Sequence, residues 1–439
     1  MAISQNFPNT RPSLNLNFAR SKTLDPRITF SRTSAGTYVD DNGFIKTASA
    51  DEPRFDHDHT TGESLGLLVE EARSNYYHRW NPTTDTATHI NSSHIDTQTT
   101  SSLQTPLGVT ATAYTATKTG NSGQYHGLNG GSNYINITSD TSVSFSAYLK
   151  EFNSSDYRLY FVISAYNVST NNRRYLLYRA RPSNGTWASG SVDSNWSTPT
   201  LNIKDCGNGW YRYEITSTNT YESGWDIIET SFQLLNESNA QFYDPPTANT
   251  HGLYLSAPQV EVGAFPTSYI PIVSTNTTAR TADSVSITGT NFSDWFNQDE
   301  GTVYADMGPY VSTDTGNFGI SIGSASNNYL AFPYITSDGT YSRDVYWRDP
   351  TVAETINFSS GSTAGKYAIA YKNSERLTGY FNGTLGEDTV GAWPNPSGYN
   401  SLRIGTSHFA SGQRQNFYLK QFTYYPSALS NAILQTLTK

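Results

Sequence analysis

Apolar and polar residues alternate with a period of two along many short stretches of the chain. Val143, Phe145, Ala147 and Leu149, for example, alternate with serine and tyrosine residues, as in a strand with one buried face. The further stretches that we expect to form strands are 14–18, 27–32, 65–69, 159–165, 175–180, 210–215, 253–257, 303–307, 367–371, 377–381, 402–404 and 417–425. The pattern predicts an all-β protein.

A helical period stands out at the end of the chain. Leu429, Ile433 and Leu437 recur at helical spacing, and Ser430 has the short polar side chain typical of a helix N-cap. This pattern predicts a short C-terminal helix.

Polar, turn-rich stretches divide the predicted strands into groups. Residues 76–105 and 271–297 are rich in serine, threonine and asparagine, whereas Asn184-Gly185 and Asn382-Gly383 predict tight hairpins within the groups. Short strands at this spacing are typical of antiparallel sandwiches. We therefore predict an N-terminal region over 1–85, a jelly-roll sandwich over 86–275 and a second antiparallel sandwich over 276–439.

The stretch 14–75 is polar and turn-rich, and its apolar residues come in short groups. Asp41-Asn42-Gly43 and Thr61-Gly62 mark turns within it. A segment of this kind has too little apolar surface to fold alone. Its strands are therefore expected to complete either a following domain or another copy of the chain, because open strand edges invite such pairing.

The composition indicates a weakly charged, outward-facing surface. Charged residues make up 15% of the 439, and the chain contains 31 tyrosines. Hydroxyl-rich and amide-rich surfaces of this kind suit neutral, hydroxyl-rich partners. The net charge of −9, without a local Lys/Arg cluster, argues against nucleic acid as a partner, because binding of phosphates needs a basic face.

The compartment can also be addressed from the sequence. Cys206 is the single cysteine, so no intramolecular disulfide is expected. The first residues lack the basic and apolar regions of a signal peptide. No apolar run approaches the ~20 residues that span a bilayer, so no membrane insertion is expected. These features fit a particle that assembles in a cytoplasm and leaves by lysis.

Three segments of the stretch 14–75 carry a family resemblance. "DPRITFSRTSAGTYVDDNGFIKTA", "PRFDHD" and "GESLGLLVEEARSN" resemble the N-terminal region of a family of bacteriophage virion proteins, the tail-fibre, tail-spike and head-fibre subunits. At His59-Thr60 the chain lacks the Pro-containing turn of that family. The resemblance implies a homotrimeric protein on the exterior of the tail or capsid, made in the host cytoplasm. Residues 1–85 would attach it to other virion proteins.

The later parts of the chain resemble two β-domain families found in such fibres. "GNGWYRYEIT" and "GLYLSAPQVEVGAFPTSYIP" resemble carbohydrate-binding-module-like jelly rolls, in which the residue equivalent to Trp210 belongs to the core. "YKNSERLTGYFNGTL", "LRIGTS" and "FTYYPSALSNAILQTLT" resemble concanavalin A-like (laminin-G-like) domains. These resemblances imply a fibre or spike subunit that contacts host-surface glycans. A head or neck decoration fibre without a receptor role and a polysaccharide-degrading tail spike are the alternatives.

The spacings typical of catalytic sites are absent from the sequence. It lacks the Glu-x-Asp-x-x-Glu pattern of glucanases, the Gln-x-His pattern of alginate lyases, a Gly-x-Ser-x-Gly elbow and a P-loop. The pairs Asp299-Glu300 and Glu387-Asp388 have the wrong parity for two carboxyl groups on one strand face, or lie in loops. We therefore predict that the protein is not an enzyme, although carboxylates from different strands could still meet in space.

Asp56-His57-Asp58-His59 is the cluster most typical of a metal site. Alternate residues of a strand share a face, so two histidines or two aspartates could point together. Zinc and similar metals usually take three or four protein ligands, so a solvated turn is the simpler interpretation. We predict no cofactor, and calcium stays open as an alternative because it is common in jelly rolls, although no EF-hand-like loop is present.

Exposed aromatic rings in polar loops are the residues from which we expect sugar recognition. The face of such a ring can stack on the apolar face of a pyranose, with amides and hydroxyls nearby. Burial in a core or between subunits is the alternative for each ring. The candidate ligand-binding residues are Trp187, Trp196, Tyr221 and Trp225 in the middle domain and Trp347 and Trp393 in the last.

Overall fold

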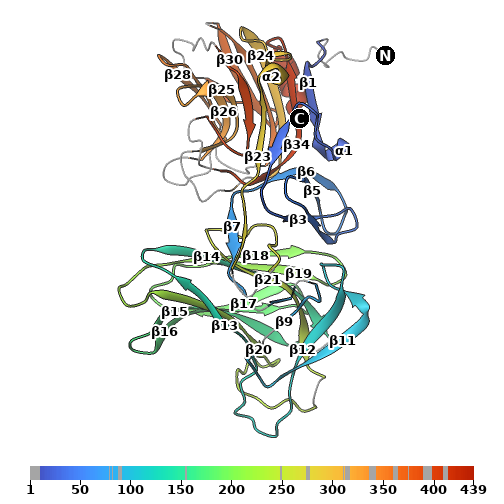
Figure 1. The fold of residues 1–439 in the computed structure, drawn as a ribbon, viewed down its shortest axis with the longest axis vertical. Helices are drawn as coiled ribbons and strands as arrows, with labels where there is room; N and C mark the ends of the chain where they lie inside the picture. The colour runs from blue at the N-terminus through green and yellow to red at the C-terminus, as the bar shows by residue number, and fades with distance from the viewer. Residues whose placement is uncertain are drawn as a thin grey trace.

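Two antiparallel β-sandwiches make up the computed structural model of the protein (Figure 1). Strands dominate the described residues and the helices are short, so the predicted all-β class is confirmed. The structure describes residues 10–78, 80–81, 83–87, 91–153, 156–247, 250–272, 277–309, 311, 317–335, 343–358, 364–373, 375–388, 398–408 and 414–439.

The C-terminal sandwich, at the top of Figure 1, consists of two eight-stranded sheets. The first has the order β31 (Thr384–Leu385), β30 (Arg376–Phe381), β29 (Gly365–Lys372), β24 (Glu300–Met307), β34 (Phe417–Tyr425), β6 (Ser64–Val69) and β5 (Arg54–His57), with β1 (Leu14–Asn17) also paired to β34. The second has the order β2 (Thr29–Ser31), β23 (Ser284–Thr288), β33 (Ser401–Ile404), β25 (Asn317–Ala325), β26 (Asn328–Ile335), β27 (Val345–Arg348), β28 (Ala353–Asn357) and β32 (Glu387–Asp388).

The middle sandwich, at the bottom of Figure 1, consists of two six-stranded sheets. We call the first the outer sheet; its order is β10 (Asn91–Ser93), β13 (Gly127–Asn136), β20 (Ile227–Leu235), β15 (Arg158–Asn167), β16 (Asn172–Arg181) and β17 (Thr186–Val192). The second, the inner sheet, has the order β11 (Ile95–Gln104), β12 (Thr110–Ala116), β21 (Gly252–Val262), β14 (Thr141–Phe152), β19 (Tyr211–Asn219) and β18 (Thr200–Asp205).

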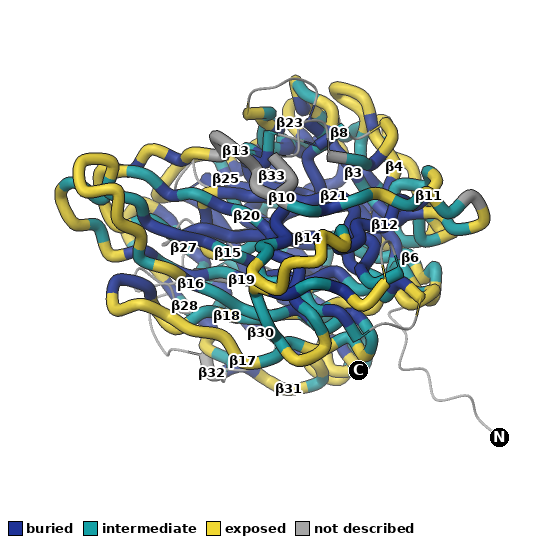
Figure 2. The backbone as a smooth tube through the Cα atoms, turned by 90° about the horizontal axis from the view of Figure 1, so that it is seen from below, coloured by how far each residue is buried: buried dark blue, intermediate teal, exposed yellow. Residues whose placement is uncertain are grey.

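The inner sheet faces the C-terminal sandwich. On that side Tyr148 and Trp210 pack in one buried cluster with Ile45 of the stretch 14–75, which we call the N-terminal segment. Trp210 is buried, as expected from its position, and its Nε1 donates to the carbonyl of Gln104 (3.1 Å). The outer sheet therefore lies on the far side of the middle sandwich, the side from which Figure 2 views the molecule.

The middle sandwich is an insertion into the C-terminal sandwich. The chain leaves through β7 (Arg73–Asn75) and returns through β22 (Thr278–Arg280), and these two strands pair with each other as an antiparallel ribbon. The Asn75 side chain is completely buried and ties the ribbon to the middle sandwich, because its Oδ1 accepts from Val260 N–H (3.1 Å) and its Nδ2 donates to the Ile270 carbonyl (3.0 Å).

Strands of the N-terminal stretch complete the C-terminal sandwich of the same chain. β1 pairs with β34 so that Leu14 lies opposite Tyr424, β6 pairs with the other end of β34, and β2 pairs with β23. Leu16 and Leu67 lie in the same core cluster as residues of the C-terminal strands. The strands therefore have a partner domain within the chain, and it is the domain most distant in sequence.

The remaining elements are short. The predicted C-terminal helix is confirmed as α3 (Asn431–Thr438), which buries Leu434 against Tyr304 and Tyr380. Ser430 is its N-cap residue, but the serine side chain makes no capping hydrogen bond. The others are α1 (Phe18–Ser21), α2 (Thr290–Ser293), the hairpin β3 (Gly36–Val39) and β4 (Ile45–Ala48), and the hairpin β8 (Trp80–Asn81) and β9 (Thr86–Ala87).

Candidate functional site

The outer sheet turns one side toward the core and the other away from the rest of the molecule (Figure 2). Along β15, Leu159, Phe161, Ile163 and Ala165 are completely buried in the core. Successive side chains of a strand point to opposite sides, so the residues between these four point outward. They are Tyr160, Val162, Ser164 and Tyr166.

The strand register extends this outward-facing set across the sheet. β16 pairs with one side of β15 and β20 with the other, and residues directly opposite each other share a face. The outward partners are Arg179 and Gln233 beside Tyr160, Leu177 and Ser231 beside Val162, Tyr175 and Glu229 beside Ser164, and Arg173 and Ile227 beside Tyr166. With Tyr134 of β13, which lies opposite Glu229, we call this surface the outer face.

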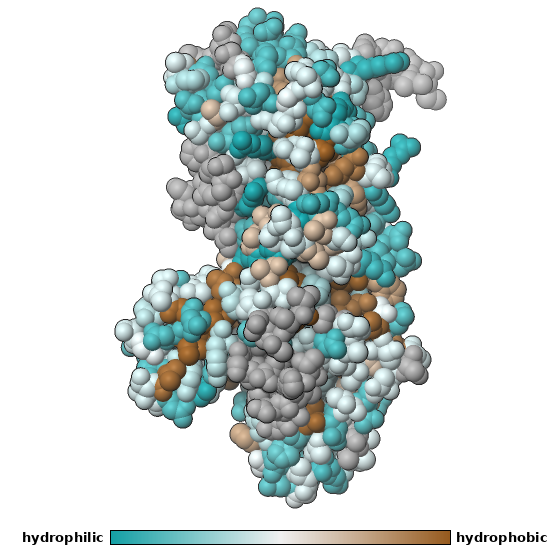
Figure 3. Space-filling model, viewed as in Figure 1, coloured by the Kyte–Doolittle hydropathy of each residue, from teal (hydrophilic) through white to brown (hydrophobic). Residues whose placement is uncertain are grey.

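Tyrosine rings dominate the outer face. Tyr134 and Tyr175 expose 44% and 38% of their surface, which is high for aromatic residues in a sheet. In the side view of Figure 3, which does not look onto the outer face, hydrophobic residues gather where the two sandwiches meet and in a strip over the part of the middle sandwich that carries β14, β15 and β16 in Figure 1. Exposed rings beside hydrogen-bonding groups form a surface on which a sugar ring can stack.

Arginine side chains hold two of these tyrosines. The Arg173 guanidinium lies 4.1 Å from the ring centroid of Tyr166 and that of Arg179 lies 5.9 Å from the centroid of Tyr160. Arg173 is also fixed by Glu229, at 2.6 Å between Nε and Oε2. Each cation–π contact limits the motion of a half-buried ring, so the outer face is organised before a ligand arrives.

Two of the tryptophans predicted to bind ligand lie in cores. Trp347 is completely buried in the C-terminal sandwich, and Trp196 is buried in the middle sandwich, where its Nε1 donates to the carbonyl of Arg174 (3.1 Å). Neither offers a ring face to a ligand, because hydrophobic packing covers both sides. Trp393 lies outside the described residues.

The other predicted aromatics are half-buried at the rim of the middle sandwich. Trp187 lies opposite the buried Ala180, so its ring turns inward and packs 5.1 Å from Phe161. The ring of Trp225 is covered by the guanidinium of Arg174 at 4.0 Å. Tyr221 donates its hydroxyl to Asp226 (2.9 Å). The ligand-binding role of these three stays a prediction.

Sequence analysis missed the tyrosines of the outer face. Both sides of β15 carry large residues, so alternation alone does not tell which side is the core. The signal that distinguishes them is the hydroxyl: the buried positions are Leu, Phe, Ile and Ala, whereas the outward aromatic positions are Tyr160 and Tyr166. A phenol needs a hydrogen-bond partner, which water supplies on an exposed face.

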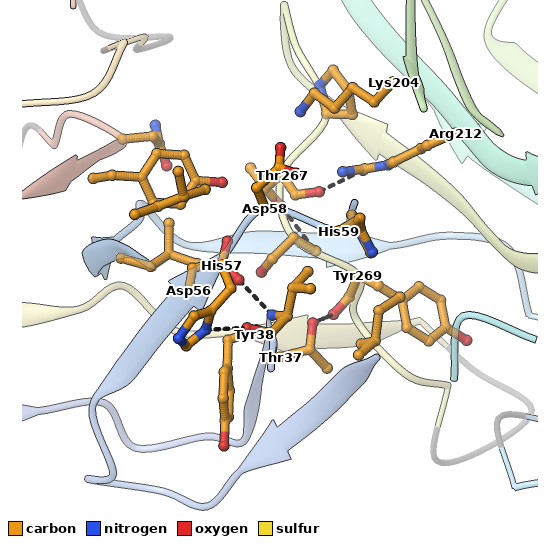
Figure 4. A pocket seen from close by; sticks show the side chains of 18 of the residues that line it. Thr37, Tyr38, Asp56, His57, Asp58, His59, Lys204, Arg212, Thr267 and Tyr269 are labelled. Carbon is orange, nitrogen blue, oxygen red and sulfur yellow. Dashed lines mark hydrogen bonds between the residues drawn. The ribbon is translucent and has the colours of Figure 1, made fainter. Parts of the chain in front are cut away.

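A pocket lies where the two sandwiches meet (Figure 4). This junction pocket, of about 710 Å³, is lined by residues between Thr37 and Glu70, by the inner sheet, and by residues 265–269, Pro309, Val311 and 416–418. The Tyr148 ring of the inner sheet lies 5.7 Å from the His59 ring there, and Arg212 donates to the Thr267 carbonyl (2.7 Å; Figure 4). The pocket therefore exists only when the two sandwiches are docked on each other.

The cluster Asp56-His57-Asp58-His59 lies along this pocket, and its residues have separate structural roles. Asp56 and His57 are buried and hold β3, because Asp56 accepts from the Val39 N–H and His57 Nδ1 lies 2.9 Å from the Val39 carbonyl. Asp58 accepts from the backbone N–H groups of Thr60 and Thr61 (both 2.9 Å) and organises a turn. The interpretation of all four residues as a solvated turn is thus wrong for Asp56 and His57, since β5 pairs with β6 inside a sheet.

No metal site is formed by the cluster as described. Within the residues that the structure describes, no group of three or more His, Cys, Asp or Glu side chains is placed to hold a metal ion.

Among the same described residues, no helix has the length and hydropathy of a membrane-spanning segment.

Burial gives Asp56 an unusual protonation equilibrium. The loss of hydration raises the pKa of its carboxyl from 3.8 to about 6, against the hydrogen bonds from Val39 and Tyr418. Protonated Asp56 is thus favoured more in the folded than in the unfolded chain. Its contribution to stability is complete below pH 3.8 and is lost as the pH rises through about 6.

Asp56→Asn is therefore expected to remove the loss of folding stability that arises when the buried Asp56 carboxyl ionises above about pH 6. Between pH 4 and pH 7 the stability of the variant relative to the natural chain should rise by on the order of 2 kcal/mol. Urea unfolding at both pH values measures this difference. Asp58→Asn is the matched control: hydrogen bonds from Thr60 lower the pKa of Asp58 to about 2, so this variant should lose stability relative to the natural chain as the pH rises. A pH-independent difference for Asp56→Asn would contradict the assignment.

A buried ion network lies beside the pocket, at the base of the β7–β22 ribbon. Arg54 contacts both Glu70 (2.6 Å) and Asp283 (2.5 Å), Arg32 contacts Asp283 (3.1 Å), and Arg280 contacts Glu70 (2.9 Å). Each of these side chains is at most 5% exposed. Burial alone would raise the pKa of Glu70, but the charges of Arg280 and Arg54 outweigh it and lower that pKa to about 2. The network joins the N-terminal segment to the returning chain.

Comparisons with known proteins give only distant similarities. No protein-family model and no curated protein matches the chain. Among solved structures, the chain is similar to the CBM40 module of Ruminococcus gnavus IT-sialidase, with 14% identity over 32% of this chain and 83% of that module and a TM-score of 0.27. It is also similar to domains LG4-5 of the mouse laminin α1 chain, with 9% identity over 68% of this chain and 89% of that one and a TM-score of 0.22. At these scores the similarities carry no argument about function.

Proposed function

We propose that this protein binds glycans through the outer face of the middle sandwich. The observation that carries the proposal is the set of four tyrosines on one regular sheet surface, two of them exposed and two fixed by arginines. Tyrosine combines an apolar ring face with a hydroxyl, so it can stack on a sugar and hydrogen-bond to it at the same time. The role that we propose for the four tyrosines is therefore binding and not catalysis.

The position of the face supports a role in attachment. Thr10 and the C-terminal residue Lys439 both belong to the C-terminal sandwich, whereas the outer sheet lies at the opposite end of the molecule (Figure 1). A subunit anchored by the C-terminal sandwich would thus present the outer face to its surroundings. The N-terminal resemblance extends the proposal: the protein is a fibre or spike subunit on the exterior of a bacteriophage virion, made in the host cytoplasm, and its ligands are glycans of the host surface.

Homotrimer formation belongs to this proposal and rests on the resemblance. The N-terminal strands give it no separate support, because β1, β2, β5 and β6 all pair within their own chain. In a trimer, three outer faces would strengthen a weak single-site interaction through avidity.

Truncation of the exposed tyrosines tests the binding role. Tyr134→Ala and Tyr175→Ala each remove a ring worth about 1 kcal/mol of stacking, so the affinity for a glycan should fall about fivefold per substitution. Binding to host cells and to a glycan array measures the effect. Thermal unfolding should change little, because both tyrosines lie on the outward side of the sheet and outside the core.

Leu385→Ala is the control for the loss of an exposed apolar side chain elsewhere, since Leu385 is 50% exposed on the C-terminal sandwich. This variant should bind like the natural chain. Unchanged binding by Tyr134→Ala, Tyr175→Ala and the double variant would refute the assignment of the outer face.

A further inference from the structure

Three arginines gather at one end of the outer face. Arg158 begins β15, and Arg179 and Arg181 end β16 next to it, on the same side of the sheet as Tyr160. This concentration of positive charge stands out in a chain whose net charge is −9. Arg179 and Arg181 share a strand face by their spacing alone, but the register of two strands is needed to bring Arg158 beside them.

A single carboxylate balances the three guanidinium groups. Asp156 forms two hydrogen bonds with Arg181 (both 2.7 Å) and lies 3.2 Å from Arg158. The bond from Arg181 lowers the pKa of Asp156 to about 2, so this carboxylate is ionised at neutral pH. Arg179 donates instead to the backbone carbonyl of Ser189 (2.7 Å) and to the Ser189 hydroxyl. The group of four thus carries an excess of positive charge.

The other end of the outer face, near Tyr166, carries no excess charge among the described residues. There the guanidinium of Arg173 is paired with Glu229 through two hydrogen bonds of 2.6 and 3.2 Å. Six residues along β15 separate Tyr160 from Tyr166, which corresponds to about 20 Å. The outer face is therefore longer than one sugar ring and is charged at one end only.

We propose that the ligand of the outer face is an acidic glycan, with an anionic group bound by Arg158, Arg179 and Arg181 and a sugar ring stacked on Tyr160. Guanidinium groups bind carboxylate, sulfate and phosphate through paired, charge-assisted hydrogen bonds. The Tyr160 ring lies beside them and supplies the apolar surface for the sugar that carries the anion. This inference rests on the proposed function and narrows it, because the overall composition of the chain by itself favours neutral partners.

The test uses the full chain on an array that pairs acidic glycans, carrying carboxylate, sulfate or phosphate, with neutral glycans of matched backbone. We expect the acidic members to bind and the neutral ones to bind at least tenfold more weakly. Binding of the acidic members should weaken as the salt concentration rises, since screening reduces the attraction. The member of the acidic set that binds best identifies which anion is recognised.

Arg179→Gln is the informative variant, because among the described residues the hydrogen bonds of Arg179 go to Ser189 and to no carboxylate, so its loss leaves no buried charge unpaired. It should weaken binding of the acidic glycan about tenfold or more. Binding of a neutral glycan should weaken only about twofold, because that ligand loses only the support that Arg179 gives to the Tyr160 ring. Arg174→Gln is the matched control. Arg174 lies on the same strand, but it covers Trp225 and pairs with Glu222 away from the outer face.

The outcomes separate the two levels of the proposal. If neutral glycans bind through the tyrosines with no effect of Arg179→Gln or of salt, the acidic-glycan inference fails and the proposed function stands. If no member of the array binds, both fail. Equal losses for Arg179→Gln and Arg174→Gln would show a general effect of removing charge and would overturn the assignment to the three arginines.

Discussion

Replacing Asp283 with alanine is expected to lower the free energy of unfolding by about 3–5 kcal/mol. Asp283 is completely buried and neutralises Arg32 and Arg54, and its carboxylate also accepts the backbone N–H of Glu70 (2.9 Å). Without it, Arg32 keeps only backbone carbonyl partners, and Arg54 shares Glu70 with Arg280, so buried positive charge is left without a matching carboxylate. The loss should appear as a large decrease in the melting temperature and in the urea midpoint.

The control for this prediction is Glu375→Ala. Glu375 forms an ion pair with Lys372 at 2.6 Å, a distance as short as those of the network, but both side chains are exposed. Exposed pairs contribute at most about 1 kcal/mol, so this variant should unfold almost like the natural chain. Similar small effects for both variants would mean that the network is dispensable for the junction.

Two deletions are expected to have opposite outcomes. A chain that lacks residues 10–75 should not fold its C-terminal sandwich, because β34 loses β1 and β6 and the core loses Leu16 and Leu67. A chain in which a short Gly-Ser linker replaces residues 76–277 should keep a folded C-terminal sandwich. Asn75 and Thr278 lie opposite each other in the ribbon, only about 5 Å apart, so a tight turn can close the gap.

Circular dichroism, cooperative thermal unfolding and resistance to protease measure the result for both deletions. The chain without the insertion is expected to be less stable than the natural one, since Ser268 no longer donates to Glu70 (2.7 Å). Cooperative unfolding should persist nevertheless. The insertion topology would be refuted if the chain without residues 10–75 folded and the chain without 76–277 did not.

Much of the secondary structure could be predicted from local sequence, but the way in which the parts combine could not. The alternation at Val143–Leu149 and the helical spacing of Leu429, Ile433 and Leu437 report which side of an element is buried, and the structure contains β14 and α3 there. The pairing of Leu14 with Tyr424 spans almost the whole chain. Period and composition contain no information about a partner at that distance.

The side chains of the candidate site also could not be brought together from local sequence alone. Sequence reasoning selected aromatic residues in polar, loop-like stretches, yet Trp196 and Trp347 are buried in cores. It did not single out Arg158 or Arg179, although the pairing of β15 with β16 brings them to one end of a surface. Which charges and rings share a face follows from register, and register is a property of the folded sheet.

The ribbon of β7 and β22 also determines how the molecule responds to tension. A pull on the middle sandwich is transmitted to the C-terminal sandwich along two covalent strands in parallel, and their antiparallel pairing keeps the two aligned with the load. A single linker would let the domain swivel, whereas two adjacent crossings oppose torsion. A single proteolytic cut within either crossing would likewise leave the domain tethered by the other. In the proposed role as a virion subunit that binds host glycans, this double connection would keep the two sandwiches joined under load.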